Sequence, residues 1–317
     1  MTVSLQNKRI LVTGGCGFIG SHLVEALWRD NKVVVVDNLS SGSLRNLSGF
    51  DVEFHQQDIA APLDEIMART DIVFHTAASV SVAVSVEDPA VDAASNVMGL
   101  LNVLNAARRH PIERLVFSSS TAVYGVALYL PIDEAHPMDP ISPYGLTKLT
   151  GERYFRLFQK LEGLPAVCLR YFNVYGPRQR ANSPYSGVIS IFAQNAVEGR
   201  PSTVYGDGEQ SRDFVNIRDV VRANVLAAAA PADKAVGQVF NVGTGRAVTL
   251  NEILALLGVP RDKVSYGPVR PGDIRASLAD TRWAEFMIGF RAEVALDSGL
   301  KEYLAWRAAD LKSPAGS

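Results

Sequence analysis

The sequence has little cysteine and almost no excess of charge. Of its 317 residues only Cys16 and Cys168 are cysteines, one in a glycine-rich loop and the other in an apolar run. This placement argues against a disulfide framework and against a metal site, and such sparse cysteine use fits a reducing, cytoplasmic compartment. The net charge of −2 offers no basic surface for nucleic acid or acidic lipids.

Long apolar runs are also missing. Apolar residues make up 47% of the chain, yet no run of them approaches the roughly 18 residues of a membrane span. Residues 1–10 lack the apolar core of a signal peptide. We therefore expect a globular, cytoplasmic protein without a membrane or nucleic-acid partner, long enough for one large domain or two smaller ones.

The first half of the chain alternates two kinds of segment. One kind is a short apolar run. The other is a longer stretch with helical spacing, and such stretches, at 18–30, 92–109 and 144–162, separate most of the short runs. Continuous apolar strands separated by helices indicate a parallel sheet covered on both faces, with right-handed crossovers. We therefore predict an α/β fold with a doubly wound parallel (Rossmann) sheet in residues 1–173. The predicted strands are 9–14, 32–38, 52–58, 71–77, 114–120 and 166–172.

The pattern loosens after Asn173. We interpret residues 174–317 as a smaller α/β domain, parts of which, near 213–243, return to the first domain. Its first and last loops are rich in Gly and Pro, and short helices are expected in the tail from 249 onward. The predicted elements are a loop at 173–187, a helix at 188–199, a strand and helix at 212–230, a strand at 237–243 and a loop at 266–273.

A glycine loop follows the first predicted strand. Gly14, Gly17 and Gly20 are spaced three residues apart, between a strand and a helix that starts near Phe18. Glycine permits a tight turn and a close approach of ligand to backbone, and the helix N-terminus attracts a pyrophosphate. Asp37, at the end of the second strand, suits the ribose hydroxyls of NAD and would repel a 2′-phosphate. The alternative is a structural turn with a solvated Asp.

Tyr144 and Lys148 are spaced i,i+4 in SPYGLTK, so on a helix they share a face. A lysine ammonium, together with the positive nicotinamide of NAD, should lower the pKa of the tyrosine toward neutrality. The phenolate would then serve as a general base. The alternative is a packed tyrosine and a solvated lysine at an ordinary helix start.

At this point the chain resembles the extended short-chain dehydrogenase/reductase superfamily, and within it the UDP-glucose 4-epimerase group. The resemblance covers nearly the whole chain. It implies NAD as the bound cofactor, a UDP-sugar substrate, C4 epimerisation through a 4-keto intermediate, and a homodimer formed by the helices at 92–109 and 144–162. The matching motifs occur in order as TGGCGFIGSHL, DNLSSG, HTAA, SSSTAVYG, SPYGLTK, RYFNVYGPRQ, YGDGEQSRDFVNI and FNVGTG.

The same resemblance implies which residues form the site. Ser120, four residues before the Tyr of VYG, would be the catalytic hydroxyl beside Tyr144 and Lys148. Ser119 is taken as structural. Besides Gly14, Gly17, Gly20, Asp37, Tyr144 and Lys148, the implied cofactor residues are Phe18, Ile19, Asn38, Ser40, Ser41, Gly42, Asp58, Ile59, Thr76, Ala77, Ala78, Asn96, Ser118 and Phe172. The implied substrate residues, with Ser120 and Tyr144, are Asn173, Val188, Thr203, Tyr205, Arg212, Arg270, Asp273 and Ser277.

Four positions depart from related patterns. Thr121 and Ala122 stand where the related 4,6-dehydratases carry an Asp-Glu pair, which disfavours dehydration. Val80 stands where many such epimerases place a lysine near the cofactor, so the affinity for NAD or the tendency of NAD to be reduced would differ. Ser277 stands where some members have a tyrosine, and its small side chain leaves room for a 2-acetamido group, so we expect turnover of UDP-GlcNAc and UDP-GalNAc as well as UDP-glucose and UDP-galactose.

Two other functions stay open at this level. One is epimerisation of another nucleotide sugar, such as UDP-glucuronate, which would need a cationic or hydroxyl-rich pocket for the carboxylate. The other is a non-catalytic NAD-binding sensor on the same fold. Sensors of that kind typically lose the Tyr or the Lys, and this chain keeps both Tyr144 and Lys148.

Overall fold

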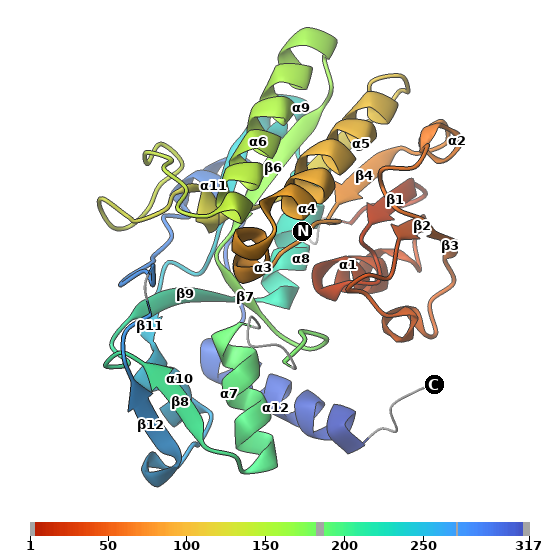
Figure 1. The fold of residues 1–317 in the computed structure, drawn as a ribbon. Helices are drawn as coiled ribbons and strands as arrows, with labels where there is room; N and C mark the ends of the chain where they lie inside the picture. Colours follow the sequence, from red (N-terminus) through yellow and green to blue (C-terminus); the bar gives the residue numbers. More distant parts are fainter. Residues whose placement is uncertain (1–3, 182–186, 271, 313–317) are drawn as a thin grey trace.

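A seven-stranded parallel sheet forms the centre of the molecule (Figure 1). The computed structural model describes residues 4–181, 187–270 and 272–312; parts of the two predicted loops and the end of the tail lie outside them. The strand order is β10-β6-β5-β4-β1-β2-β3 and every pairing is parallel, so the predicted doubly wound α/β fold is confirmed. The strands are β1 (Arg9–Thr13), β2 (Lys32–Asp37), β3 (Glu53–Gln56), β4 (Ile72–His75), β5 (Arg114–Ser120), β6 (Ala166–Tyr171) and β10 (Val239–Val242).

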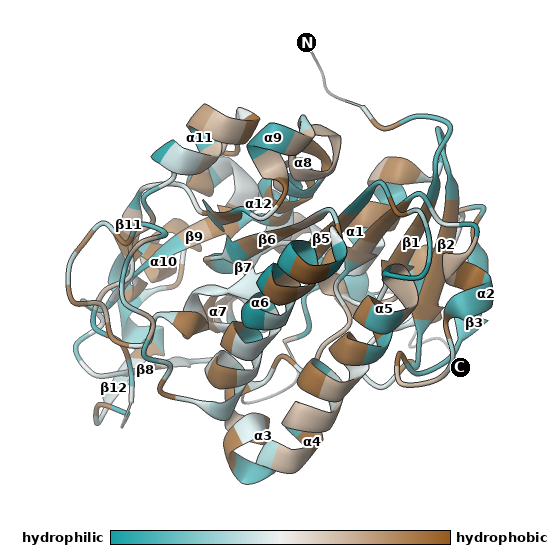
Figure 2. Cartoon of the chain, turned by 90° about the horizontal axis from the view of Figure 1, so that it is seen from above, coloured by the Kyte–Doolittle hydropathy of each residue, from teal (hydrophilic) through white to brown (hydrophobic). Residues whose placement is uncertain are grey.

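Helices cover both faces of this sheet. Successive valines of β2 enter opposite cores, Val33 and Val35 on one face and Val34 and Val36 on the other, as the two-residue period of a strand requires. Helices α1 (Phe18–Leu27) and α8 (Ile217–Ala229) pack together over the first core. The second core lies under α5 (Leu100–Ala107) and α6 (Pro143–Glu162), which run side by side in Figure 2 above strands coloured as hydrophobic.

Local sequence signals set the bounds of α6, which carries the Tyr–Lys pair. The Ser142 hydroxyl accepts a hydrogen bond from Gly145 N–H, Pro143 occupies the first turn, and Gly163 ends the helix with φ +68°. The predicted helix at 92–109 is instead divided into α4 (Pro89–Ala93), a π-helical segment (Ala94–Gly99) and α5. Such π-helical turns often occur at functional sites. Shorter helices in this half are α2 (Asp64–Met67) and α3 (Val82–Glu87), with 3₁₀ turns at Leu44–Leu47 and Thr121–Val123.

The rest of the chain forms a second layer of smaller sheets with its own core. Leu300 and Tyr303 are buried there on α12, which has 17 residues and is longer than the short helices expected in the tail. Two small sheets have the orders β11-β9-β7 and β12-β8. The elements of this layer are β7 (Asn173–Tyr175), α7 (Val188–Glu198), β8 (Ser202–Tyr205), β9 (Ser211–Asn216), β11 (Ala247–Thr249), α10 (Leu250–Leu256), the 3₁₀ turn Arg261–Lys263, β12 (Val264–Gly267) and α12 (Leu296–Lys312). The short helices α9 (Ala232–Ala235) and α11 (Arg282–Ile288) contact each other and pack into the first core of the large sheet instead.

Strand β10 comes from the second half of the sequence but belongs to the large sheet. Its residues Val239–Val242 pair with Cys168–Tyr171 of β6, and α8 packs on β5 and β6. The chain therefore crosses between the two layers more than once, and the boundary near residue 173 stays a prediction. In the part of the chain that the structure describes, no helix is long and apolar enough to cross a membrane.

Candidate active site

The expected catalytic residues and most of the expected cofactor residues lie along one edge of the large sheet. All its strands are parallel, so the carboxyl ends of β1, β2, β4 and β5 meet at the same edge, and the chain leaves β1 and β4 in opposite directions along the sheet. In sheets of this kind ligands bind at that edge, near the point where the strand order reverses. The glycine loop, Asp37, the residues after His75 and the serines of β5 all lie there.

The glycine loop is packed so closely that side chains are excluded. Gly14 has φ +71°, and a Cβ on it would lie 2.7 Å from Ala77 N in the loop after β4. A Cβ on Gly20 would collide with the Gly14 carbonyl, so α1 can press directly against the loop. Gly17 is the N-terminal cap residue of α1 and has no capping side chain. Because no side chain caps the helix, the first N–H groups of α1 can donate to a pyrophosphate.

Asp37 is fixed at the end of β2. Its Oδ2 accepts a hydrogen bond from Cys16 N–H at 2.9 Å and its Oδ1 accepts one from Leu39 N–H at 2.8 Å. Each carboxylate oxygen keeps a further lone pair, which a ribose diol can use. The carboxylate and the glycine cradle together fit the adenosine and pyrophosphate parts of NAD.

The other expected cofactor residues lie in the loops that leave the same edge. The Asn38 amide donates to Asp58 at 2.7 Å, which ties the loop after β2 to the loop after β3, and Thr76 donates to the Thr13 carbonyl at 2.6 Å. Phe18 and Ile19 open α1, Ile59 and Phe172 are buried, and Gly42 packs against Cys16. Positions 40, 41, 77 and 78 lie in these loops and retain exposed surface. Their roles in binding stay predictions.

A segment of the second layer reaches over this edge. Arg178 has φ +66° and its guanidinium pairs with Glu25 of α1 at 2.6 Å, while Arg180 donates to the Gly42 carbonyl at 3.4 Å. On the other side the Gln179 carbonyl accepts hydrogen bonds from Tyr303 and Arg307 of α12. The segment thereby links α12 to the helix that begins at the glycine loop.

Ser120 and Tyr144 lie together, as the resemblance implied. Ser120 ends β5 and its hydroxyl accepts a hydrogen bond from Ala122 N–H at 3.2 Å. Tyr144 opens α6, where its N–H donates to the Ser85 hydroxyl. In the chain alone the pKa of Tyr144 is raised to about 12, because burial outweighs a hydrogen bond with Ser120 that acts in the opposite direction. The expected lowering of this pKa by Lys148 is therefore not seen without the cofactor.

Lys148 is buried beneath the tyrosine. Its ammonium donates to the Ser118 carbonyl at 2.9 Å and lies 5.9 Å from the centre of the Tyr144 ring. Burial lowers its pKa from 10.5 to about 8, while the charges of Asp92 and Glu152 act in the opposite direction. The Ser118 hydroxyl is hydrogen-bonded to Tyr171 at 3.1 Å. The three expected catalytic residues thus lie within one turn of α6 and the tip of β5.

A buried polar network that the sequence analysis missed holds α6 against the π-helical segment. Asp92 accepts a hydrogen bond from Thr147 at 2.7 Å and another from Asn96 at 3.0 Å. Asn96, expected at the cofactor, also bonds both backbone groups of Ser79. The Asp–Asn spacing of four residues at the start of a predicted helix was the available signal.

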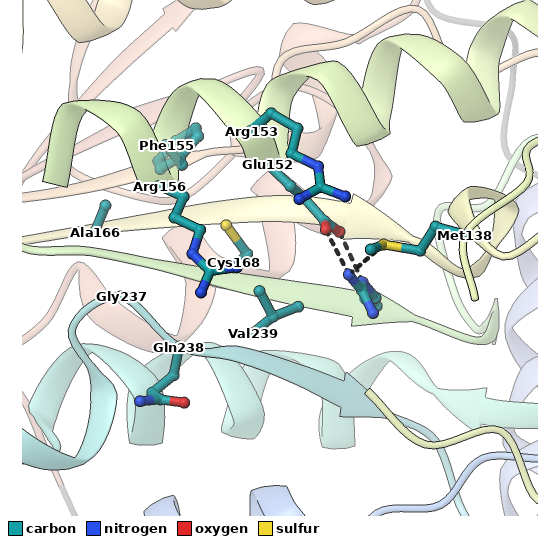
Figure 3. Close-up of a pocket in the computed structure, with 11 residues that line it drawn as sticks. Met138, Glu152, Arg153, Phe155, Arg156, Ala166, Cys168, Gly237, Gln238 and Val239 are labelled. Carbon is teal, nitrogen blue, oxygen red and sulfur yellow. Dashed lines mark hydrogen bonds and ion pairs between the residues drawn. The ribbon is translucent and has the colours of Figure 1, made fainter. Parts of the chain in front are cut away.

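A second missed network lies on the other side of α6. The Ser119 hydroxyl donates to Glu152 at 2.5 Å, so its structural role has a defined partner. Glu152 also receives a two-pronged ion pair from Arg170 of β6, and both side chains are buried. Figure 3 shows this ion pair, drawn as dashed lines, beside a small pocket that Met138 and Cys168 help to line. Ser119 therefore anchors the strand tip between its two neighbouring serines.

The second layer brings together part of the expected nucleotide-sugar site. Arg212 of β9 pairs with Asp273 at 2.6 Å, and the Arg270 guanidinium lies 3.7 Å from the centre of the Tyr205 ring. Ser277 is buried, and its N–H donates to the Ser211 carbonyl, which places it directly beside Arg212. These five residues from β8, β9 and the 270–277 segment form two arginine-centred pairs and one small buried side chain.

Other expected residues are less closely tied to that group. Thr203 is exposed on β8 and its hydroxyl bonds Ser265 of β12 at 3.1 Å. Asn173 is exposed at the start of β7, and Val188 opens α7. Val80, at the position noted for a lysine, is 65% exposed.

Comparisons with known proteins agree with this fold. The chain matches the NAD dependent epimerase/dehydratase family over residues 10–243. It is 39% identical over 305 residues to the UDP-glucose 4-epimerase of Mycolicibacterium smegmatis, covering 92% of this chain and 96% of that one. The chain therefore belongs to the NAD dependent epimerase/dehydratase family, the extended short-chain dehydrogenase/reductase group that its motifs resemble.

Solved structures show how closely the fold is shared. A UDP-N-acetylglucosamine 4-epimerase from Methanobrevibacter ruminantium, in complex with UDP-N-acetylmuramic acid, has a TM-score of 0.92 at 38% identity, over 96% of this chain and 100% of that one. The Thermotoga maritima UDP-glucose 4-epimerase with UDP-glucose has a TM-score of 0.90 at 40% identity, with the same coverage. A UDP-glucuronic acid 4-epimerase from Bacillus cereus reaches 0.87 at 30% identity, over 95% and 99%. NAD is the cofactor of this family, and the glycine cradle and Asp37 fit it.

Proposed function

We propose that the protein is an NAD-dependent C4 epimerase of a UDP-hexose. The observation that carries the proposal is the placement of Ser120, Tyr144 and Lys148 together at the ligand-binding edge of an NAD-dependent fold. That arrangement offers a tyrosine for acid–base chemistry and a buried cation, Lys148. It also offers the Ser120 hydroxyl, which can hydrogen-bond the same substrate oxygen as the tyrosine. A non-catalytic sensor would have no need for this set.

The chemistry follows from these positions. When bound, NAD would take a hydride from C4 of the sugar and return it, and the positive charge of its oxidised form would favour the phenolate of Tyr144. Tyr144 Oη accepts the proton of the 4′-hydroxyl, while Ser120 hydrogen-bonds the same oxygen. Lys148 stabilises the phenolate from below. The 4-keto sugar turns over within the site, and Tyr144 returns the proton to the epimerised alcohol.

Dehydration lacks the groups that it needs. Elimination of water requires an acid and a base in addition to the tyrosine. The 3₁₀ turn that follows Ser120 carries Thr121 and Ala122, and neither has a carboxylate. The family includes dehydratases, and this local difference supports epimerisation over dehydration for this chain.

The second layer would hold the UDP group. Arg212 and Arg270 offer guanidinium groups to the diphosphate, and Tyr205 a ring face to the uracil. Ser277 leaves space beside the sugar, which supports turnover of UDP-GlcNAc and UDP-GalNAc in addition to UDP-glucose and UDP-galactose. Ser277→Tyr should abolish turnover of the acetamido sugars and spare the plain hexoses, and equal loss of both would remove the specificity proposal.

The test of the reaction is direct. Purified protein is incubated separately with UDP-glucose, UDP-GlcNAc and UDP-glucuronate, and the C4 epimers are resolved by chromatography. Tyr144→Phe should lose interconversion while retaining bound NAD, because only the phenolic oxygen is removed. Unchanged interconversion by that variant would refute the mechanism, and turnover of UDP-glucuronate alone would replace the proposed substrate.

A homodimer is part of the same proposal. Apolar side chains stay exposed on α3, α4, the π-helical segment and α6, elements that contact one another and include the helices expected at the dimer contact. Burial of these side chains in a second copy would remove them from water. Sedimentation should give twice the mass of the chain, and Leu157→Lys should shift it to the monomer. The exposed residues are Val82, Val86, Val91, Met98, Leu146, Leu157 and Leu161.

A further inference from the structure

Asp92 is a fully buried carboxylate that the proposed reaction does not use. It lies on α4 with 0% of its surface exposed. Its two oxygens accept hydrogen bonds from Thr147 and Asn96, which are both neutral. Within residues 4–181, 187–270 and 272–312, no cationic side chain pairs with it directly. Burying an unpaired charge is costly, so a carboxylate at this position needs a reason.

Lys148 is a buried cation that likewise has no carboxylate bonded to it directly in the part of the chain that the structure describes. It is 4% exposed and its ammonium donates to a backbone carbonyl rather than to a carboxylate. Glu152, one helical turn further on, is already engaged by Arg170. Of the four buried charged side chains described here around α6, Glu152 and Arg170 pair with each other, whereas Asp92 and Lys148 have no direct counter-ion among the described residues. These two are connected through Thr147, the residue before Lys148. Charges separated by protein interior interact over longer distances than they do in water.

We propose that Asp92 is a positioning residue that holds α6 through Thr147 and balances the buried charge of Lys148 beside Tyr144. The proposal rests on the proposed function, in which this pair performs the acid–base step. The Thr147 hydroxyl, which donates to Asp92, also lies 3.0 Å from the Tyr144 carbonyl, so its one hydrogen is shared between the two acceptors. Asp92 is thereby linked through Thr147 to the backbone of Tyr144, and Lys148 is the next residue in the chain. Removal of Asp92 would therefore change both the charge of the site and the position of α6.

The charge of Asp92 acts on both partners in the same direction. It raises the pKa of Lys148 and raises the pKa of Tyr144. Few other charges face it: α6 contributes Tyr144 and Lys148, α3 contributes Glu87, which is exposed like the capping Asp88, and the π-helical segment Ala94–Gly99 carries no charged residue. Removing the negative charge should therefore move both limbs of a pH–rate profile to lower pH.

The experiment compares two kinds of change at this site. Asp92→Asn removes the charge and keeps the shape, and both limbs of the pH profile of kcat should move down by about one pH unit. Thr147→Val keeps both charges and removes the hydrogen bond, so kcat should fall with the limbs in place. Asp88→Asn, an exposed cap on the same helix, is the matched control and should leave the profile unchanged. Asp92→Glu should restore the limbs.

A second readout is independent of turnover. The tyrosinate absorbance of the NAD-loaded protein, minus that of Tyr144→Phe, reports the titration of Tyr144 alone, and its midpoint should fall in Asp92→Asn. An unchanged midpoint would overturn the proposal. If the wild-type protein turned over no UDP-sugar, the proposed function would fail while this titration would still decide the role of Asp92. Asp92→Ser, which also removes the charge and keeps a hydrogen-bonding oxygen, replaces the Asn variant if that variant does not fold.

Discussion

Lys148 should lower the stability of the fold that contains it. Burial lowers the pKa of this lysine from 10.5 to about 8. Because one pKa unit corresponds to about 1.4 kcal/mol, holding the charged form in the folded protein at pH 7 costs about 3 kcal/mol. Lys148→Met removes that cost but also removes the hydrogen bond to the Ser118 carbonyl. We expect the free energy of unfolding to rise by about 1–2 kcal/mol while epimerisation is lost.

The pH dependence makes this expectation specific. Between pH 8 and 10.5 the unfolded chain holds the proton of Lys148 more tightly than the folded chain, so this lysine makes the wild-type stability rise with pH in that range. Other groups act oppositely at high pH, since burial raises the pKa of Tyr144 to about 12 and that of Cys16 to about 12. These contributions cancel in the difference between the wild type and Lys148→Met. That difference should therefore shrink as the pH is raised from 7 to 10.

Urea unfolding, followed by tryptophan fluorescence with the NAD content of each sample measured, gives the free energies at each pH. Lys160→Met is the matched control, because Lys160 is exposed in the last turn of the same helix and should change stability by less than about 0.5 kcal/mol. Destabilisation by Lys148→Met of more than about 1 kcal/mol, or a difference independent of pH, would refute the reasoning.

Three further substitutions test other parts of the structure. Glu152→Gln leaves the Arg170 guanidinium buried without its counter-ion and should lower the free energy of unfolding by about 3 kcal/mol or more, measured in urea; a loss below about 1 kcal/mol would contradict this. Arg178→Ala removes the ion pair to Glu25 across the cofactor edge, so NAD should dissociate several-fold faster in a displacement assay; an unchanged rate would count against a retaining role. Asp37→Asn removes the charge that opposes a 2′-phosphate, and the NADP:NAD affinity ratio from calorimetry should rise about tenfold; a constant ratio would show that selectivity comes from elsewhere.

The large sheet could be predicted because most of its strands can be recognised from their own local sequence. Five of the six predicted strands contain a continuous apolar run, and parallel strands buried on both faces require that composition. The exception is 52–58, which becomes the partly exposed edge strand β3. The common edge could also be predicted, because the glycine loop follows β1 directly while Asp37 and Ser120 are the last residues of β2 and β5. Local order in the sequence was enough to place these residues on the same edge.

The networks behind α6 could not be predicted in the same way. Asp92 and Thr147 are 55 residues apart, and Glu152 and Arg170 are 18 apart on different elements. Their pairing depends on how α4 and β6 lie against α6, which periodicity alone does not specify. The break of the helix at 92–109 into a π-helical segment has the same origin, because the Asn96 contacts to Ser79 depend on the loop after β4. The raised pKa of Tyr144 likewise depends on burial that only the folded chain creates.

The position of β10 has a consequence for synthesis of the chain. A ribosome releases β6 long before Val239–Val242, roughly 70 residues later, can pair with it. At about 5–20 residues per second, the nascent protein holds an unpaired, apolar strand edge for several seconds. That interval is when a chaperone would find a binding surface that the finished protein no longer has. A chain cut near residue 173 would keep the edge permanently, so it should aggregate even though every residue of the first six strands is present.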